Sequence, residues 1–225
     1  MINYYSGNPK FYLAVDCIIF GFMDNKLSLL LLKRQFEPAK GHWSLMGGFV
    51  NEDESVDDAA KRVLKELTGL DNIYMEQVGA FGDIGRDPGE RVISITYYAL
   101  INIDDYDKNL VKSFNAFWAD INELPDLIFD HKVMVEKARH IMKQKVSNNP
   151  IGFNLLPDLF TLTQLQNLYE AILGETIDKR NFRKRVSDIT FIEKTNMIDK
   201  TCSKRGAYLY KINSELYREN HKFKI

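Results

Sequence analysis

Residues 48–70, GFVNEDESVDDAAKRVLKELTGL, restrict the possible folds more than any other part of the chain. Gly69 marks the end of a helical pattern there, because glycine readily adopts the left-handed backbone that closes a helix. The spacing of the apolar residues predicts a helix over 55–67 that buries one face against another layer of the fold. The residues on that face are Val56, Ala59, Ala60, Val63, Leu64 and Leu67.

Apolar runs on either side of this helix predict a sheet. Residues 12–22 and 27–33 are rich in aliphatic side chains and flank the turn residues MDNK, which predicts a hairpin. Residues 74–81 and 92–102 predict two further strands, and residues 131–146 predict an amphipathic helix. Strands interrupted by a helix favour an α+β fold, with a mixed sheet flanked by helices.

Length and composition restrict the class of protein. The chain has 225 residues, of which 45% are apolar, 27% charged and 12% aromatic, as in globular proteins. No apolar run approaches the ~20 residues that cross a bilayer, and the first ten residues lack the apolar core of a secretory signal. Cys17 and Cys202 are far apart and show no metal-binding spacing. We therefore expect a cytoplasmic protein with no membrane partner.

The segment 48–70 resembles the Nudix box, whose pattern is G, five residues, E, seven residues, then R-E-apolar-x-E-E-x-G-apolar. The preceding residues PAKGHWSLMGGFV resemble the family's lead-in strand, with Met46 where proline is usual. The resemblance extends over residues 12–145 and implies a Nudix-type mixed sheet flanked by helices. The pattern positions that match are Gly48, Glu54, Arg62, Leu64, Glu66, Gly69 and Leu70.

Two of the three carboxylates that the family uses to hold a divalent cation are missing. In this chain the three positions are Val63, Glu66 and Leu67, and aliphatic side chains cannot bind a hard cation. We therefore predict no metal site, no catalytic residues, no cofactor and no significant pyrophosphatase activity. The sequence leaves open a replacement of the lost ligands by other acidic residues. The candidates are Glu54, Asp83, Asp87 and Glu90.

A Nudix domain that binds a ligand without consuming it suits a sensor, because such a ligand can shift a conformational population. Asp16 is a candidate because a carboxylate in an apolar strand needs a partner, either structural or a ligand. Trp43 and Phe81 could stack on a sugar or base, and His131 could be functional, but we expect packing or capping for all three. The predicted effector-binding residues are Asp16, Arg34, Phe49, Glu66, Asp83, Arg86 and Glu90.

The last third of the chain differs in charge. Residues 1–149 hold 17 basic and 22 acidic residues, a net −5, whereas residues 150–225 hold 13 and 9, a net +4. The residues SNNPIGFNLLP between them predict a hinge. Helices are predicted over 163–173 and 178–190, followed by a strand around residues 203–211. A basic helix after a short turn favours nucleic acid as a partner.

Residues 155–217 resemble a small winged helix-turn-helix domain, in which the second helix enters the major groove and the wing contacts the backbone. The rival interpretation is a solvated helix face. Phe182, Val186 and Ile189 would anchor the second helix. The predicted DNA-binding residues are Lys179, Arg180, Asn181, Arg183, Lys184, Arg185, Lys204 and Arg205.

The two domains in this order, 1–149 and 150–225, resemble the Nudix-related transcriptional regulators, as does the segment RDPGERVISITYYAL. The resemblance implies a homodimer on a palindromic double-stranded DNA operator and a small effector. We expect a repressor of sugar catabolism genes that responds to L-arabinose first and to ADP-ribose second. One alternative is a Nudix hydrolase of ADP-ribose or a nucleotide sugar with an accessory domain, and another is a protein-interaction module.

Overall fold

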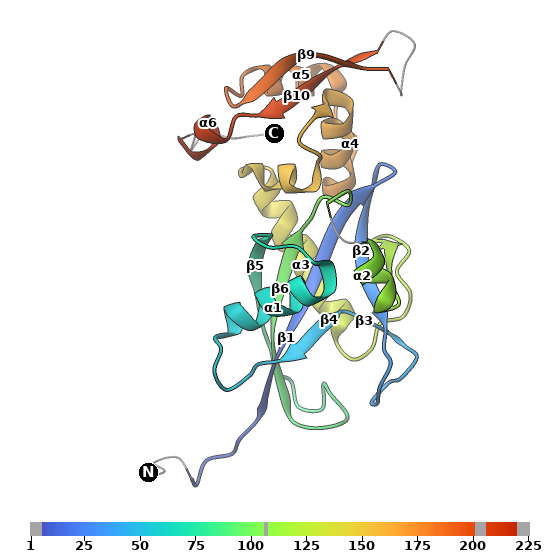
Figure 1. Cartoon of the computed structure of the whole chain (residues 1–225), viewed down its shortest axis with the longest axis vertical. Helices are drawn as coiled ribbons and strands as arrows, with labels where there is room; N and C mark the ends of the chain where they lie inside the picture. The colour runs from blue at the N-terminus through green and yellow to red at the C-terminus, as the bar shows by residue number, and fades with distance from the viewer. Residues whose placement is uncertain (1–5, 106–107, 201–205, 220–225) are drawn as a thin grey trace.

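The computed structural model describes residues 6–105, 108–200 and 206–219, and the first two-thirds of the chain fold around one mixed sheet (Figure 1). The strand order is β3-β2-β1-β6-β5, with β4 paired to β1 and β7 paired to β2. The β1–β6 pair is parallel and the other pairs are antiparallel. The strands are β1 Tyr12–Met23, β2 Lys26–Lys33, β3 Trp43–Ser44, β4 Met46–Phe49, β5 Tyr74–Phe81, β6 Val92–Leu100 and β7 Ala116–Asp120.

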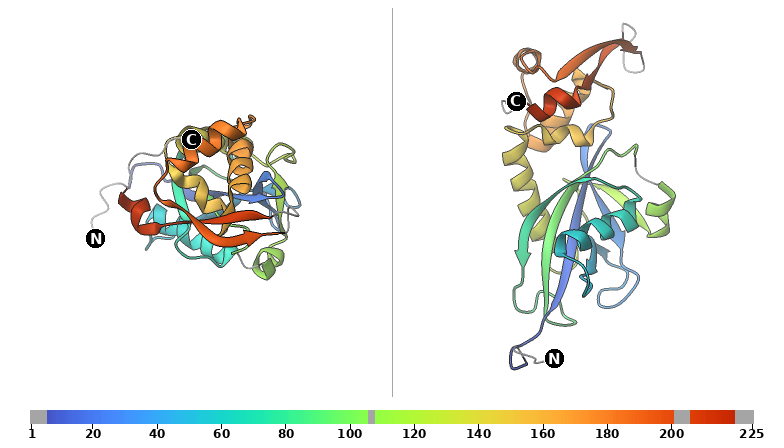
Figure 2. Two further views of the ribbon diagram at one scale, coloured as in Figure 1. Left: turned by 90° about the horizontal axis from the view of Figure 1, so that it is seen from above. Right: turned by 60° about the vertical axis from the view of Figure 1, so that its left-hand side comes forward.

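Helices cover both faces of this sheet, as the sequence predicts. Alternate residues of β1 serve the two sides, because successive strand side chains point in opposite directions. Val15 and Cys17 pack under α1, whereas Ile18 and Phe20 pack under α3. Figure 2 shows α1 and α3 on opposite sides of the strands. The helices of this part are α1 Val56–Thr68, the short α2 Lys108–Ser113 and α3 His131–Val146.

The predicted limits of α1 are confirmed. The Ser55 hydroxyl accepts a hydrogen bond from the Asp58 N–H at 3.1 Å, the usual N-cap arrangement. Gly69 has φ 74°, and its N–H bonds to the carbonyl of Lys65. Glycine is favoured there because this left-handed backbone is strained for other residues.

The C-terminal third forms the predicted helix-turn-helix with a wing. Thr161 and Gln164 form a capping box at the start of α4, and Asp178 caps α5 through the Asn181 N–H at 2.8 Å. The predicted wing strand is present, although Lys204 and Arg205 lie outside the described residues. The elements are the 3₁₀ helix η1 Pro150–Leu155, β8 Phe160–Thr161, α4 Leu162–Leu173, α5 Lys179–Ser187, β9 Ile192–Asp199, β10 Ala207–Ile212 and α6 Ser214–Glu219.

The prediction of a hinge between the domains is wrong for residues 150–155. They form η1, whose Ile151 and Leu155 side chains are buried. The residues SNNP indicate a loop, but the apolar residues that follow them are buried and fix this segment to the core. One hydrophobic cluster runs from the sheet through α3 and η1 into α4, so the two parts share a core.

Two polar contacts also join the parts. Asn167 of α4 donates to the side-chain oxygen of Asn25 in the β1–β2 turn at 2.8 Å. Lys143 of α3 donates to the Leu173 carbonyl at the end of α4 at 3.0 Å. The winged helix therefore sits on the end of the sheet where β1 turns into β2 (Figures 1 and 2).

Candidate functional site

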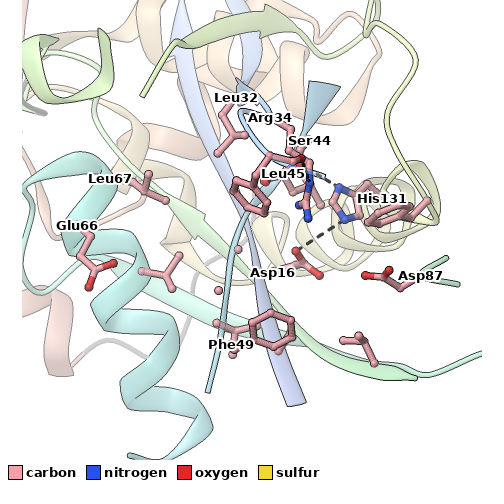
Figure 3. Close-up of a pocket in the computed structure, with 18 of the residues that line it drawn as sticks. Asp16, Leu32, Arg34, Ser44, Leu45, Phe49, Glu66, Leu67, Asp87 and His131 are labelled. Atoms are coloured by element: carbon pink, nitrogen blue, oxygen red, sulfur yellow. Dashed lines mark hydrogen bonds and ion pairs between the residues drawn. The ribbon is translucent and has the colours of Figure 1, made fainter. Parts of the chain in front are cut away.

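A cavity of about 300 Å³ opens between α1 and the first residue of α3 (Figure 3). Small-molecule sites measure roughly 300–1,000 Å³, so a ligand of moderate size can enter it. The titratable residues in its wall are Asp16, Arg34, Arg62, Glu66, Arg86, Asp87 and His131. The aromatic residues in its wall are Phe36, Phe49, Phe114 and Phe129.

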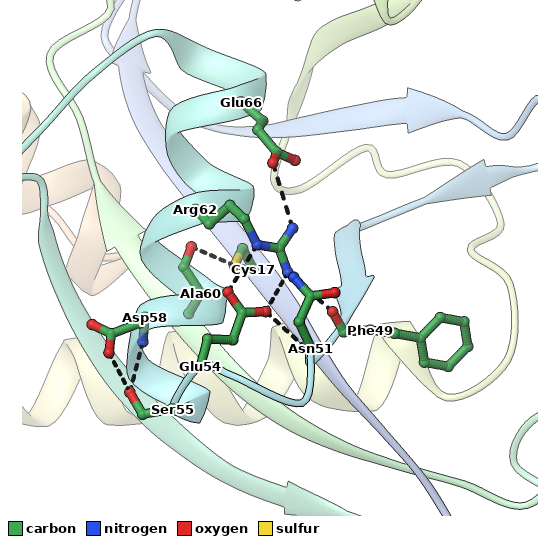
Figure 4. A network of polar contacts seen from close by, with 9 residues as sticks. All are labelled: Cys17, Phe49, Asn51, Glu54, Ser55, Asp58, Ala60, Arg62 and Glu66. Carbon is green, nitrogen blue, oxygen red and sulfur yellow. Dashed lines mark hydrogen bonds and ion pairs between the residues drawn. The ribbon is translucent and has the colours of Figure 1, made fainter.

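On the α1 side, Arg62 and Glu54 form the centre of a polar network (Figure 4). Arg62 donates from Nε to Glu54 Oε2 at 2.9 Å and from Nη2 to Oε1 at 2.6 Å. The Asn51 N–H donates to the same Oε1 at 2.9 Å. The hydrogen bonds from Arg62 first, and from Asn51 second, lower the pKa of Glu54 to about 2. Both oxygens of Glu54 are thus engaged in holding the loop before α1.

The donor set on α1 does not fit a resident divalent cation. Val63 and Leu67 are buried in the core under α1, as expected for residues on the apolar face of that helix. Glu66 alone remains, at 3.5 Å from Arg62 Nη1. A divalent cation such as Mg²⁺ or Ca²⁺ takes six or more oxygen ligands. One carboxylate provides too few of them, and the neighbouring arginine repels a cation.

The acidic residues that could replace the lost ligands do not gather near Glu66. Glu54 is paired with Arg62, and Asp87 lies on the far wall, where its Oδ1 accepts the Gly89 N–H at 2.8 Å. Asp83 and Glu90 are exposed and outside the cavity wall. Over the described ranges, no group of three His, Cys, Asp or Glu side chains is arranged to hold a metal ion.

On the opposite side, Arg86 is the centre of a second, more deeply buried network. Its side chain is 4% exposed and binds both oxygens of Asp130, with Nε–Oδ2 at 2.8 Å and Nη2–Oδ1 at 2.7 Å. Nη2 also lies 3.7 Å from Asp16 Oδ2, which accepts the Ser94 hydroxyl at 2.6 Å. Arg86 thus ties the loop before β6 to β1 and to the start of α3.

His131 is a wall residue and not only a packing residue, contrary to the sequence interpretation. Its Nδ1 accepts the Leu45 N–H at 3.1 Å, so the proton of the neutral ring is on Nε2. Burial is the main cause that lowers the pKa of His131, which keeps the ring neutral. Nε2 lies 3.8 Å from Asp16 Oδ1. The position of His131 at a predicted helix start does not by itself indicate that the residue lines a cavity.

Arg34 differs from the other cavity arginines. Its guanidinium lies 4.1 Å from the ring centre of Phe36 and 5.8 Å from that of Phe129. Nε donates to the Phe36 carbonyl at 3.2 Å. Burial lowers its pKa more than the nearby carboxylates, Asp87 first, raise it. Within the described part of the chain it forms no ion pair, so its terminal N–H groups can receive an anion.

The structure brings five of the seven predicted effector-binding residues to this one cavity. Asp83 and Glu90 are not among them because the loop 82–91 turns their side chains toward solvent and only Arg86 and Asp87 inward. Trp43 packs against Phe117, as expected. The five that line the cavity are Asp16, Arg34, Phe49, Glu66 and Arg86. Three aromatic wall residues that the sequence analysis does not single out are Phe36, Phe114 and Phe129.

A second candidate surface lies on α5. Phe182 and Val186 anchor this helix in the core, and all of its predicted DNA-binding residues are exposed. Over the residues that the structure describes, none of the five cations forms an ion pair. The result is one basic helix face carrying Lys179, Arg180, Asn181, Arg183, Lys184 and Arg185.

Two family models match the chain. Residues 10–142 match the NUDIX domain, and residues 152–212 match the NrtR DNA-binding winged helix domain. The chain is 36% identical over 219 residues to the ADPR responsive transcriptional repressor NtrR of Acinetobacter baylyi, covering 96% of this chain and 87% of that protein. The chain belongs to the NrtR family.

Solved structures agree with membership of the NrtR family. Shewanella oneidensis NrtR complexed with a 27mer DNA has a TM-score of 0.81 and 29% identity, covering 95% of this chain and 97% of that chain. The NUDIX domain of the same protein complexed with ADP ribose has a TM-score of 0.50 and 29% identity, covering 61% and 96%. The predicted fold class, a Nudix domain followed by a winged helix, is therefore confirmed.

A third relative of this NrtR family member is an enzyme. The ADP-ribose pyrophosphatase of Methanocaldococcus jannaschii is 34% identical over 127 residues, covering 56% of this chain and 75% of the enzyme. None of these three relatives is named for L-arabinose or for sugar catabolism. No helix in the described residues is long and apolar enough to cross a membrane.

Proposed function

We propose that this chain is a transcriptional repressor whose Nudix domain binds ADP-ribose without hydrolysing it. The observation that carries the proposal is the course of α3. Its first residue, His131, lines the cavity, and near its far end Lys143 bonds to the α4 carbonyl of Leu173. Sixteen residues at 1.5 Å per residue span about 24 Å. One rigid element thus connects the ligand pocket to the helix-turn-helix.

Within the described ranges Arg34 forms no ion pair, and this supports an anionic effector. A partly buried cation without a carboxylate partner is poorly compensated until an anion binds it. ADP-ribose carries a diphosphate, whereas L-arabinose has no charge. The relatives named for ADP-ribose support the same choice. We therefore place ADP-ribose before L-arabinose, reversing the order expected from the sequence.

The wall of α1 supports binding without turnover. Val63 and Leu67 replace two carboxylates, and Glu54 is held by Arg62. The alternative, a hydrolase with an accessory domain, is favoured only by the resemblance to the archaeal pyrophosphatase. Incubation of the full chain with ADP-ribose and Mg²⁺ or Mn²⁺, followed by chromatography for AMP, tests it. Turnover that depends on added metal would contradict the proposal.

The proposal includes a homodimer on a palindromic operator, because the winged helix relatives act on DNA and a dimer matches a two-fold operator. It also includes a cytoplasmic location, where we expect the operator DNA to be. We keep the division into domains at residues 1–149 and 150–225 as part of the proposal, although the two parts share a core.

Fluorescence anisotropy tests the repressor directly. The probe is DNA from upstream of the gene cluster that encodes the chain, and a fragment of unrelated sequence is the control. We expect tight binding of the first probe and at least tenfold weaker binding when ADP-ribose is added. L-Arabinose at the same concentration should leave the affinity unchanged. Release by L-arabinose alone would reverse our choice of effector, and equal binding of both fragments would contradict a specific regulator.

A further inference from the structure

The floor of the cavity holds a donor and an acceptor that do not satisfy each other. His131 Nε2 carries a proton, because Nδ1 accepts the Leu45 N–H. Asp16 Oδ1 is 3.8 Å away, beyond the 3.2 Å at which N–H···O bonds are normally found. Among the described residues, no hydrogen bond reaches either atom. The two side chains are 4% and 12% exposed, so both groups are nearly removed from solvent.

A hydroxyl group placed beside the two atoms can bridge them, because they are too close together for an oxygen to lie on the line between them. It can donate its proton to Asp16 Oδ1 and accept from His131 Nε2–H, at about 2.8 Å from each. A phosphate is excluded from this position because the Asp16 carboxylate would repel it. Figure 3 shows the two side chains facing each other across the cavity floor.

The lack of a side chain at Gly47 leaves space next to Asp16 Oδ1. Gly47 pairs with Asp16 across the β1–β4 ladder, and a Cβ at this position would lie 2.5 Å from Asp16 Oδ1. Any side chain there would fill the space that the acceptor faces. The close approach of β4 therefore holds the Asp16 side chain in place while leaving its oxygen accessible from the cavity.

The position of the pair indicates which hydroxyl it receives. Phe36 and Phe49 are 61% and 58% exposed at the mouth, where a flat base can stack on them. Arg34 stands beside Phe36 and suits the diphosphate. The end of the ligand farthest from the base then reaches the buried floor. In ADP-ribose that end is the ribose beyond the diphosphate.

We propose that Asp16 Oδ1 and His131 Nε2 bind a hydroxyl of this distal ribose and so distinguish ADP-ribose from ADP. The inference rests on the proposed function, since it takes ADP-ribose as the ligand. It assigns His131 a binding role, and it assigns Ser94 and Arg86 the positioning of Asp16.

Isothermal titration of the full chain with ADP-ribose and with ADP tests the inference. Asp16→Asn retains the size of the side chain but loses the negative acceptor. His131→Asn retains an oxygen near the position of Nδ1 for the Leu45 N–H but lacks a donor at Nε2. Each substitution should weaken ADP-ribose binding about tenfold or more and change ADP binding by less than about twofold. Asp83→Asn, in an exposed carboxylate outside the cavity wall, is the control and should leave both affinities unchanged.

Three results would overturn the inference. An equal loss of affinity for both ligands would mean that the pair only supports the cavity. Unchanged affinity for ADP-ribose in both folded variants would mean that no hydroxyl binds there. Failure of the unsubstituted chain to bind ADP-ribose would overturn the proposed function together with the inference, whereas the first two results leave that function intact. Circular dichroism melting confirms that each variant is folded.

Discussion

The arginines of the pocket and the cations of α5 differ in whether they are paired with carboxylates. Arg62 and Arg86 each form short double hydrogen bonds with one carboxylate. The cations of α5 are exposed and, in the part of the chain described, form no ion pairs. A buried charge needs a partner because desolvation is costly, whereas exposed charges of one sign create a field that attracts a polyanion. We therefore expect paired cations to hold the structure together and unpaired cations to bind a ligand or DNA.

Arg34 is the exception among the pocket arginines, because it forms no ion pair within the described residues. It lies in the pocket, as Arg62 and Arg86 do, but it has aromatic neighbours where they have carboxylates. By the same criterion it belongs with the binding cations. The largest effects should therefore follow from unpairing a buried charge, and smaller ones from removing an unpaired charge.

Removal of Arg86 should cost the most stability. Arg86→Met leaves Asp130 and Asp16 without their cation, and breaking a buried pair costs about 3 kcal/mol or more. Urea denaturation followed by circular dichroism measures the free energy of unfolding. Lys61→Met is the control, since its pair with Asp58 is exposed and should contribute about 0.5 kcal/mol or less. Equal effects of the two substitutions would mean that the buried ion pairs of Arg86 stabilise the fold no more than an exposed pair does.

Removal of two cations from α5 should weaken DNA binding and leave the fold unchanged. For Arg183→Ala with Lys184→Ala we expect at least about a tenfold loss of operator affinity. The slope of log affinity against log salt should fall by up to about 2, or about one for each phosphate contact. Lys132→Ala, an exposed cation on α3, is the control. A double variant with wild-type affinity and salt slope would show that α5 does not face the DNA.

Removal of the charge on Arg34 should affect only the response to effector. Arg34→Gln is expected to raise the ADP-ribose concentration needed for DNA release about tenfold, because one charge-assisted contact to phosphate is lost. DNA affinity without effector should stay the same. Anisotropy titrations at fixed protein and DNA concentrations measure both quantities. An unchanged release concentration would place the diphosphate elsewhere in the cavity.

The sequence predicts the elements better than it predicts the pocket. The helix 55–67 follows from local spacing and end signals, so its bounds agree with α1 to one residue. Only their charge in a polar loop favours Asp83 and Glu90, and the path of that loop depends on tertiary contacts such as Arg86–Asp130. Spacing gives no signal that His131 lines the cavity, because the orientation of its ring depends on the Leu45 N–H, 86 residues away. Contacts between residues that lie this far apart in the sequence cannot be predicted from the local spacing of residues.

The smallest predicted effect concerns Glu54 and pH. The pKa of Glu54 is lowered from 4.5 to about 2 in the folded chain, with the Arg62 hydrogen bond as the first cause. Because the folded pKa is the lower one, the resulting stability is fully present above pH 4.5 and is lost as pH falls toward 2. Glu54→Gln should therefore be less stable than the unsubstituted chain near neutrality and approach it below pH 4. Urea midpoints measured between pH 2.5 and 7 give the difference. A difference independent of pH would mean that Arg62 binds the side chain by shape rather than by charge.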